Sequence, residues 1–253
     1  TSLMAIVMVP LLGIMDKKAA YALFGNEAVF FILGAFILSA AVMHSGLASR
    51  IAVLIMDRFG NTPKGLLASI FLLAAVLSFF MSEHAVAAML FPIVLEIAKG
   101  LNLKPGKSNY AKSLFLALAW GCVIGGVATF LGGARVPLAA GMLKEATGIT
   151  IGFFEYTMVV FPTVVILLFI GYIGLTRFFP QDIQDIHLAK DVFARKIKGL
   201  GKMGYTEYAV GILMLITISS WLLFSRMAGI ANIAIISVVA LFVLKLVRWK
   251  DIE

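Results

Sequence analysis

The side chains best suited to chemistry form two short polar clusters in an otherwise apolar chain. The first is Ser78 followed by the triplet Ser82-Glu83-His84, and the second is the glycine-rich run 125–135. Hydroxyl, carboxylate, imidazole and guanidinium groups bind ions, and some of them carry protons. The sequence shows no nucleophile beside a base, no phosphate-binding loop and no metal-ligand spacing, so we expect a binding site rather than an enzyme.

The composition indicates that these clusters lie in a membrane protein. Hydrophobic residues make up 62% of the 253 residues, charged residues 13%, and the mean hydropathy is +1.04. Soluble domains carry about 45–50% apolar and about 25% charged residues. The single Cys122 excludes a disulfide framework, and we expect it to be a small buried residue.

Several apolar stretches approach the length of about 20 residues that a membrane-spanning helix needs. Residues 3–15 resemble the end of a further span whose start would precede the chain. The stretches that qualify, the first of them with its flanks, are 28–42, 154–175, 208–224 and 230–247.

Both polar clusters interrupt apolar runs. A charge such as Glu83 at the middle of a bilayer costs about 2.5–3.5 kcal/mol on an insertion scale, and both arms around it are short for spans. A re-entrant hairpin over 64–99 explains both facts. The region 108–146 reads as a helix that two glycine pairs break and that restarts at Pro137. Secondary transporters build midplane sites from such discontinuous elements.

The basic residues predict the orientation. Of the 21 Lys and Arg residues, sixteen fall on the side of the hairpin base, the 178–205 loop and the C-terminal end. Four fall on the opposite side, and Arg135 lies at depth, so we expect the first side to be cytoplasmic. The net charge of +8 therefore reflects topology and not nucleic-acid binding. Segments 47–62 and 179–205 are expected to be amphipathic helices on the cytoplasmic surface.

Both clusters carry a resemblance to the divalent anion/sodium symporter family, which includes transporters of succinate, citrate and sulfate. The run 77–93 resembles the family's first hairpin, whose tip usually reads Ser-Asn-Thr. The run 125–136 resembles its Gly-Gly-x-x-Thr-x-x-Gly-Thr-Pro-Pro-Asn segment, and Ser45-Gly46-Leu47 also fits. The resemblance covers nearly the whole chain but only the first half of the family's fold. We expect the second, inverted repeat to be supplied outside this chain.

The resemblance implies an all-α membrane protein with an inverted-repeat ion-transporter fold, comprising the first repeat and the start of the second. A transport part, which holds the hairpin and the broken helix, would move against a scaffold that forms a homodimer. The expected divisions are scaffold 1–46, interfacial helix 47–62, transport part 63–153, spanning helix 154–178, cytoplasmic linker 179–205 and scaffold 206–253.

Matching positions assign the site. The cation or proton site would use Ser78, Ser82, Glu83 and the backbone at Gly132. Ser78 and Ser82 are four residues apart, which places both on one helix face. Ser82 would also cap the second arm, whose free N–H groups favour an anion. The substrate site would use Ser82, His84, Thr129, Gly133 and Arg135.

This sequence departs from the family pattern at three charged or titratable positions. Glu83 stands where Asn is usual, His84 replaces a hydroxyl, and Arg135 lies in the Thr-Pro-Pro-Asn loop. Arg135 is expected either to pair with Glu83 and take the charge role of sodium, or to leave Glu83 to bind a proton. The structural alternatives are an ion pair that holds the hairpin shut, a His84 that only donates a hydrogen bond, and hydroxyls of Ser78 and Thr129 that bond backbone carbonyls within their own helices.

The leading hypothesis is a secondary transporter of a small divalent anion, dicarboxylate or sulfate, that works by an elevator movement in a bacterial inner membrane. Its driving cation would be a proton, or there would be none, rather than sodium at this first site. The alternative is a membrane sensor or regulator built on the same fold that does not transport. A passive anion channel is a third reading.

Overall fold

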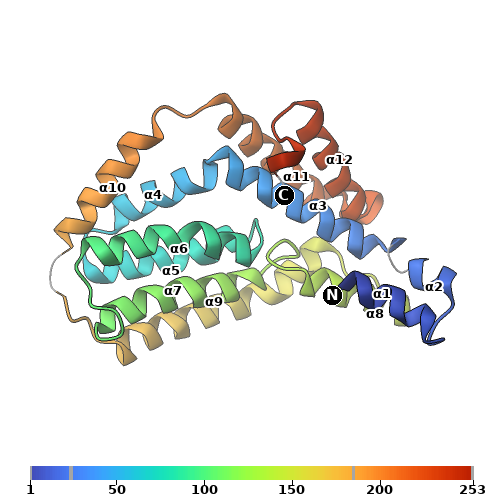
Figure 1. The fold of residues 1–253 in the computed structure, drawn as a ribbon, viewed down its shortest axis with the longest axis horizontal. Coiled ribbons are helices and arrows are strands. Elements are labelled where there is room, and N and C mark those ends of the chain that lie inside the picture. Colours follow the sequence, from blue (N-terminus) through green and yellow to red (C-terminus); the bar gives the residue numbers. More distant parts are fainter. Residues whose placement is uncertain (1, 23–24, 184–185, 252–253) are drawn as a thin grey trace.

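The computed structural model describes residues 2–22, 25–183 and 186–251, and every regular element in those ranges is a helix, which confirms the all-α class (Figure 1). The helices are α1 (Ser2–Leu11), α2 (Lys17–Ala22), α3 (Glu27–Ser45), α4 (Leu47–Phe59), α5 (Pro63–Ser78), α6 (Glu83–Gly100), α7 (Asn109–Gly126), α8 (Arg135–Thr147), α9 (Phe153–Phe178), α10 (His187–Leu200), α11 (Tyr205–Ala228), α12 (Ile230–Val243) and the short 3-10 helix η2 (Trp249–Asp251).

In the part of the chain that the structure describes, three helices are long and apolar enough to cross a membrane: one that ends with α3, together with α9 and α11. Most of the apolar surface of α9 is exposed. The hairpin helices α5 and α6 have 16 and 18 residues. At 1.5 Å per residue each is shorter than the hydrocarbon core of about 30 Å. The lengths agree with a membrane protein in which the hairpin does not itself span the bilayer.

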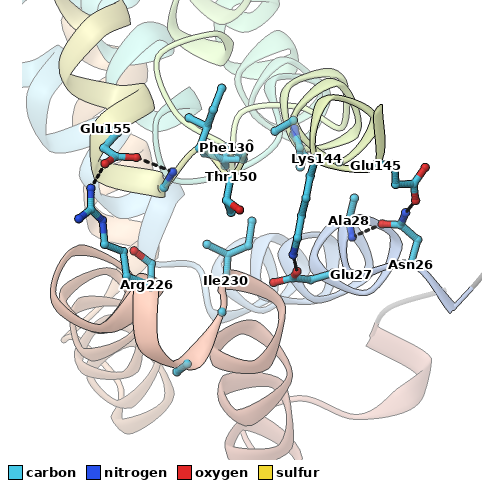
Figure 2. A pocket seen from close by; sticks show the side chains of 18 of the residues that line it. Asn26, Glu27, Ala28, Phe130, Lys144, Glu145, Thr150, Glu155, Arg226 and Ile230 are labelled. Carbon is cyan, nitrogen blue, oxygen red and sulfur yellow. Dashed lines mark hydrogen bonds and ion pairs between the residues drawn. The ribbon is translucent and has the colours of Figure 1, made fainter. Parts of the chain in front are cut away.

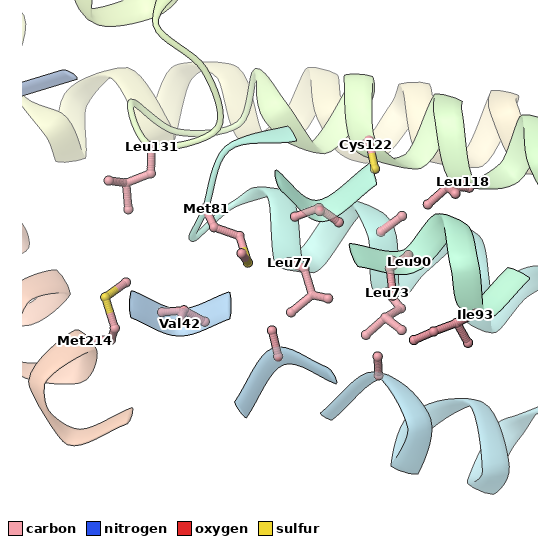
Figure 3. Close-up of a cluster of buried hydrophobic side chains, with 14 of the residues drawn as sticks. Val42, Leu73, Leu77, Met81, Leu90, Ile93, Leu118, Cys122, Leu131 and Met214 are labelled. Atoms are coloured by element: carbon pink, nitrogen blue, oxygen red, sulfur yellow. The ribbon is translucent and has the colours of Figure 1, made fainter. Parts of the chain in front are cut away.

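The first helix of the hairpin, α5, begins at residues that are typical of a helix N-terminus. Thr62 caps α5 by accepting the N–H of Gly65 at 3.0 Å, and Pro63 occupies the first helical position. The chain then turns at 79–82 and returns as α6, and both arms pack on α7 (Figure 1). Met81 on the turn is buried in the same cluster as Leu131, Val42 and Met214, which brings the tip into the core (Figure 3).

Two glycines let α7 approach α5 more closely than any other residue would allow. A Cβ added at Gly121 would lie 2.4 Å from the carbonyl oxygen of Phe71. A Cβ at Gly125 would lie 2.2 Å from that of Ala75. Small residues four apart are the usual means of close helix contact in membranes. The glycines therefore set the spacing between the hairpin and the broken helix.

The broken helix consists of α7 and α8, with residues 127–134 between them. The expected restart at Pro137 is wrong by two residues, because α8 already begins at Arg135. Proline lacks only an N–H that has no partner in the first turn, so it tolerates any position there. The earlier start places Arg135 itself at the N-terminus of α8.

The predicted span 230–247 is also wrong, because α12 ends at Val243 and has only 14 residues. The chain leaves the helix at Lys245, whose φ of 54° lies in the left-handed region. The N–H of Leu246 then bonds the carbonyl of Leu241 at 2.9 Å, a typical helix C-terminal arrangement. No glycine or proline marks this end in the sequence.

The helix α3 joins the two parts of the fold. A Cβ added at Gly34 would lie 2.7 Å from the Cβ of Ala234, so α3 and α12 are in tight contact. The helices α11 and α12 are further linked by a hydrogen bond of 2.8 Å between the hydroxyls of Thr217 and Ser237. We take α3, α11 and α12 together as the scaffold.

The amphipathic segments lie at the end of the molecule that holds the hairpin base. The helix α4 buries one face, and α10 packs on α4 and α6 (Figure 1). Arg50 of α4 donates to Glu207 of α11 at 2.8 and 3.1 Å and to the carbonyls of Leu200 and Gly201 at 2.9 Å each. Placement of these helices on a bilayer surface stays a prediction.

The loop before α10 is fastened to the start of α7 by Asp182. Its carboxylate accepts hydrogen bonds from the Ser108 hydroxyl at 3.1 Å and from the N–H groups of Asn109 and Tyr110 at 3.0 Å each. Burial opposes ionisation of Asp182, but these hydrogen bonds outweigh it and lower the pKa of the carboxyl below its ordinary value. The Tyr110 hydroxyl donates to the carbonyl of Pro63 at 2.8 Å, so the hairpin base, the start of α7 and Asp182 lie close together.

Candidate functional site

Backbone and hydroxyl contacts join the hairpin tip to the break between α7 and α8. The N–H of Glu83, the first residue of α6, donates to the carbonyl of Gly132 at 2.9 Å. The Thr129 hydroxyl donates to the carbonyl of Phe79 at 2.7 Å and accepts the N–H of Leu131 at 3.1 Å. The two irregular segments that sequence analysis singled out thus form one junction, with Thr129 bonded to the hairpin and not to its own helix.

Glu83 is the buried acid of this junction. Its side chain is 7% exposed, and Oε1 lies 2.6 Å from Nη2 of Arg135. The second oxygen, Oε2, is buried and has no hydrogen-bond partner in the described part of the chain. A Cβ added at Gly126 would lie 2.3 Å from Oε2, so the carboxylate lies directly against the glycine backbone. The site therefore holds one satisfied and one unsatisfied carboxylate oxygen.

Arg135 and His84, the cationic and titratable neighbours of Glu83, are exposed to solvent. The Arg135 side chain is 65% exposed and that of His84 is 86% exposed. His84 Nδ1 lies 3.8 Å from Glu83 Oε1, which is too far for a hydrogen bond. Both side chains stand at the N-termini of helices, α8 and α6 respectively, where the helix dipole favours an anion.

Ser82 holds the N-cap position of α6, as its residue type indicated, but its side chain makes no capping hydrogen bond. Its N–H donates instead to the hydroxyl of Ser39 on α3 at 3.2 Å. The Ser39 hydroxyl donates in turn to the carbonyl of Ala35 at 2.8 Å. The hairpin tip is therefore bonded to the scaffold as well as to the break.

The expectation that Ser78 and Ser82 share one helix face is wrong. The helix α5 ends at Ser78, and the turn 79–82 separates it from Ser82. The Ser78 hydroxyl is fully buried and has no hydrogen-bond partner among the residues described. The buried thiol of Cys122, a weak hydrogen-bonding group, is its polar neighbour.

The structure brings most of the predicted site residues together and adds two that sequence analysis missed. Around the Glu83–Arg135 pair it gathers Ser82, His84, Thr129, Gly132 and Gly133. The missed residues are Ser39, whose only signal is a polar side chain inside an apolar stretch, and Gly126, noticed only as part of a helix break. Within the described ranges, no group of three His, Cys, Asp or Glu side chains could hold a metal ion.

A pocket of about 870 Å³ lies between the scaffold helices, one face of α8 and the N-terminal end of α9 (Figure 2). Lys144 of α8 pairs with Glu27 of α3 at 2.7 Å, and Asn26 donates to Glu145. On the other side of the pocket, Arg226 of α11 pairs with Glu155 of α9. Sequence analysis did not find this pocket, because its charged residues come from four separate segments.

Comparison with known proteins identifies a family whose model matches the whole chain and relatives that match most of it. Residues 1–253 fit the model of the family described as "Sodium:sulfate symporter transmembrane region". The chain is 30% identical over 230 residues to the sodium-dependent dicarboxylate transporter SdcS of Staphylococcus saprophyticus. It is equally similar to the proteins of the same name from Staphylococcus aureus strains USA300 and NCTC 8325. These matches cover 88% of this chain but only 44% of each relative, so the chain spans less than half of their length.

Proposed function

The chain belongs to the sodium:sulfate symporter family, and we propose that it forms one half of a secondary transporter for small divalent anions. The match over the whole chain confirms the resemblance to this family, which is one of transporters rather than enzymes. The relatives described above are named as sodium-dependent dicarboxylate transporters, which makes a dicarboxylate the first substrate to test and sulfate the second. The observation that carries the proposal is the buried Glu83 paired with an exposed Arg135 where the hairpin meets the break.

The anion would bind on the open side of this pair. Arg135 offers a guanidinium of which one nitrogen contacts Glu83, leaving other donors for a carboxylate or sulfate oxygen. The N-terminus of α6, with Ser82 and His84, would contribute N–H groups and an imidazole to the same anion. Gly133 lies beside the Arg135 side chain and leaves room for the ligand. Thr129 would act by holding the hairpin tip in place.

On the buried side, the Glu83–Arg135 pair would replace a sodium ion. A family-type site would use Ser78, Ser82, residue 83 and the Gly132 carbonyl as oxygen ligands for a hard cation. Here a guanidinium already supplies the positive charge next to the carboxylate, and the Gly132 carbonyl accepts the N–H of Glu83. Because the Arg135 guanidinium already balances the charge of Glu83, we propose that this site works without sodium, either by uncoupled exchange or by proton coupling through a Glu83 released from Arg135.

The movement proposed is an elevator. The hairpin and broken helix, 63–153, would carry the anion, while 1–46 and 206–253 form a scaffold that dimerises in a bacterial inner membrane. The hairpin base and the 178–205 loop would face the cytoplasm, as the basic residues favour. The second inverted repeat, outside this chain, would complete the substrate site.

The second candidate is a membrane sensor that binds an anion and does not transport. It is favoured by one observation: the carboxylate of Glu83 and the hydroxyl of Thr129, both site groups, are already bonded to other protein groups. A junction closed in this way is what a permanently assembled structural site requires.

Uptake of labelled succinate and labelled sulfate into liposomes, by the full-length protein, separates the two candidates. The matched variants are Arg135→Gln, at the junction, and Arg226→Gln, an arginine paired in the pocket away from it. Transport through the junction predicts uptake by the wild type and by Arg226→Gln and a loss in Arg135→Gln. Anion binding without uptake by any of the three would support the sensor and overturn the proposal.

A further inference from the structure

One face of α3 contacts three segments of the proposed transport part: α8, the break before it and the hairpin tip. Residues 28, 31, 35 and 39 lie at helical spacing on this face, and all are buried. Ala28 contacts α8, since a Cβ added at Gly141 would lie 3.0 Å from the Ala28 Cβ. Phe31 contacts the break, with its ring centroid 6.1 Å from that of Phe130. The Ser39 hydroxyl contacts the hairpin tip, where it accepts the N–H of Ser82 at 3.2 Å.

Two polar contacts join the N-terminal end of α3 to α8. Lys144 pairs with Glu27 at 2.7 Å, and Asn26 donates to Glu145 (Figure 2). Both partners on the α8 side are neighbours in sequence, and both partners on the α3 side are neighbours as well. The two contacts are therefore satisfied together in one register of α8 along α3.

The other side of α3 is held differently. Gly34 packs closely against Ala234 of α12, because a Cβ added at Gly34 would lie 2.7 Å from the Ala234 Cβ. Interfaces that are packed this closely shift between discrete positions or not at all. The helix α3 thus contacts α12 by close apolar packing, and it contacts the proposed transport part by both apolar and polar contacts.

We propose that Asn26, Glu27, Lys144 and Glu145 form a lock that holds the transport part in the position seen here, and that each transport cycle must open it. A shift of one helical turn, about 5.4 Å, moves Lys144 and Glu145 out of reach of their partners and also separates Ser82 from Ser39. This inference rests on the elevator movement of the proposed function. It adds the surface along which the movement occurs and the residues that oppose it.

A disulfide across the same face tests the lock. The pair Ala28→Cys/Gly141→Cys, in a Cys122→Ala background, places two Cβ atoms 3.0 Å apart. A small separation of the two helices brings them to the disulfide range of about 3.5–4.5 Å. The control is Thr217→Cys/Ser237→Cys, which joins α11 to α12 inside the scaffold, where the hydroxyls are already 2.8 Å apart. Uptake is measured with the full-length protein in liposomes, before oxidation, after oxidation and after reduction.

The lock predicts that oxidation of the 28/141 pair abolishes uptake, that reduction restores it, and that the control pair transports in both states. Unchanged uptake by fully cross-linked 28/141 protein would overturn the inference and leave the proposed function standing. Absence of uptake by the reduced variants and the wild type alike would overturn the proposed function and the lock with it.

A charge exchange tests the lock residues themselves. Glu27→Lys or Lys144→Glu alone should slow cross-linking of the 28/141 pair by about two- to fivefold, the range expected for a half-exposed ion pair. The double exchange Glu27→Lys/Lys144→Glu should restore the rate. Equal cross-linking rates in all four proteins would mean that the pair does not hold the register.

Discussion

Replacing Arg135 by glutamine should destabilise the protein through Glu83 and through no other residue. The variant leaves a carboxylate that is 7% exposed without its 2.6 Å partner. Breaking a fully buried ion pair costs about 3–5 kcal/mol. Because the Arg135 side chain is itself 65% exposed, its attraction is partly screened. We therefore expect Arg135→Gln to lower the unfolding free energy by about 1.5–3 kcal/mol, the range for a hydrogen bond to a charged group.

A double-mutant cycle isolates this energy. Glu83→Gln removes the charge and leaves Arg135 in contact with solvent, so Arg135→Gln should cost little in that background. The expected coupling energy is about 1–2 kcal/mol. The measurement is equilibrium unfolding of the four proteins in one detergent, and Arg226→Gln provides the control. That arginine is 80% exposed and its partner Glu155 is 43% exposed, so the loss there should stay below about 1 kcal/mol.

Additive effects of Arg135→Gln and Glu83→Gln would refute the reasoning. They would mean that the two side chains do not depend on each other, and that Arg135 does not supply the charge that a sodium ion would supply next to Glu83.

Three further predictions concern groups that support the site. Gly126→Ala places a methyl group 2.3 Å from Glu83 Oε2 and should cost about 1–3 kcal/mol in unfolding free energy, while Gly199→Ala in α10, with open space around it, should not destabilise. Ser39→Ala removes the acceptor of the Ser82 N–H and should cost about 1–3 kcal/mol, whereas the exposed Ser220, which bonds only its own helix, should tolerate alanine. Asp182→Asn should cost about 1 kcal/mol at pH 7, the usual value of a helix cap. Because the pKa of Asp182 is lowered in the folded state, its stabilisation is complete above the ordinary pKa of about 3.9 and disappears as the pH falls through the lower folded value. Unfolding curves of the wild type and Asp182→Asn should therefore converge in acid, and a constant difference down to pH 2 would contradict this cause.

The sequence predicted the junction better than its surroundings. Glu83 interrupts an apolar run and the glycine pairs interrupt a helix, and both signals are local, so the hairpin and the break were visible without a structure. Their contact through Glu83 and Arg135 followed from the cost of burying a lone charge.

Long-range packing was not visible. Ser39 is 43 residues from Ser82, and nothing in either segment indicates that they meet. The end of α12 was missed because the apolar run continues to Val247 and the left-handed turn uses Lys245, where glycine would have been the usual signal. The pairing of Glu27 with Lys144 depends on how α8 lies along α3, which no periodicity specifies.

The central claim is that the Glu83–Arg135 pair takes the place of sodium at this site. Its most direct test is the uptake of labelled anion by the full-length protein in liposomes with sodium removed from both sides and a proton gradient imposed, for the wild type and Glu83→Gln. The account predicts that uptake by the wild type continues without sodium and that Glu83→Gln loses it. Uptake that stops without sodium and is unaffected by Glu83→Gln would contradict the account and assign the coupling to another site.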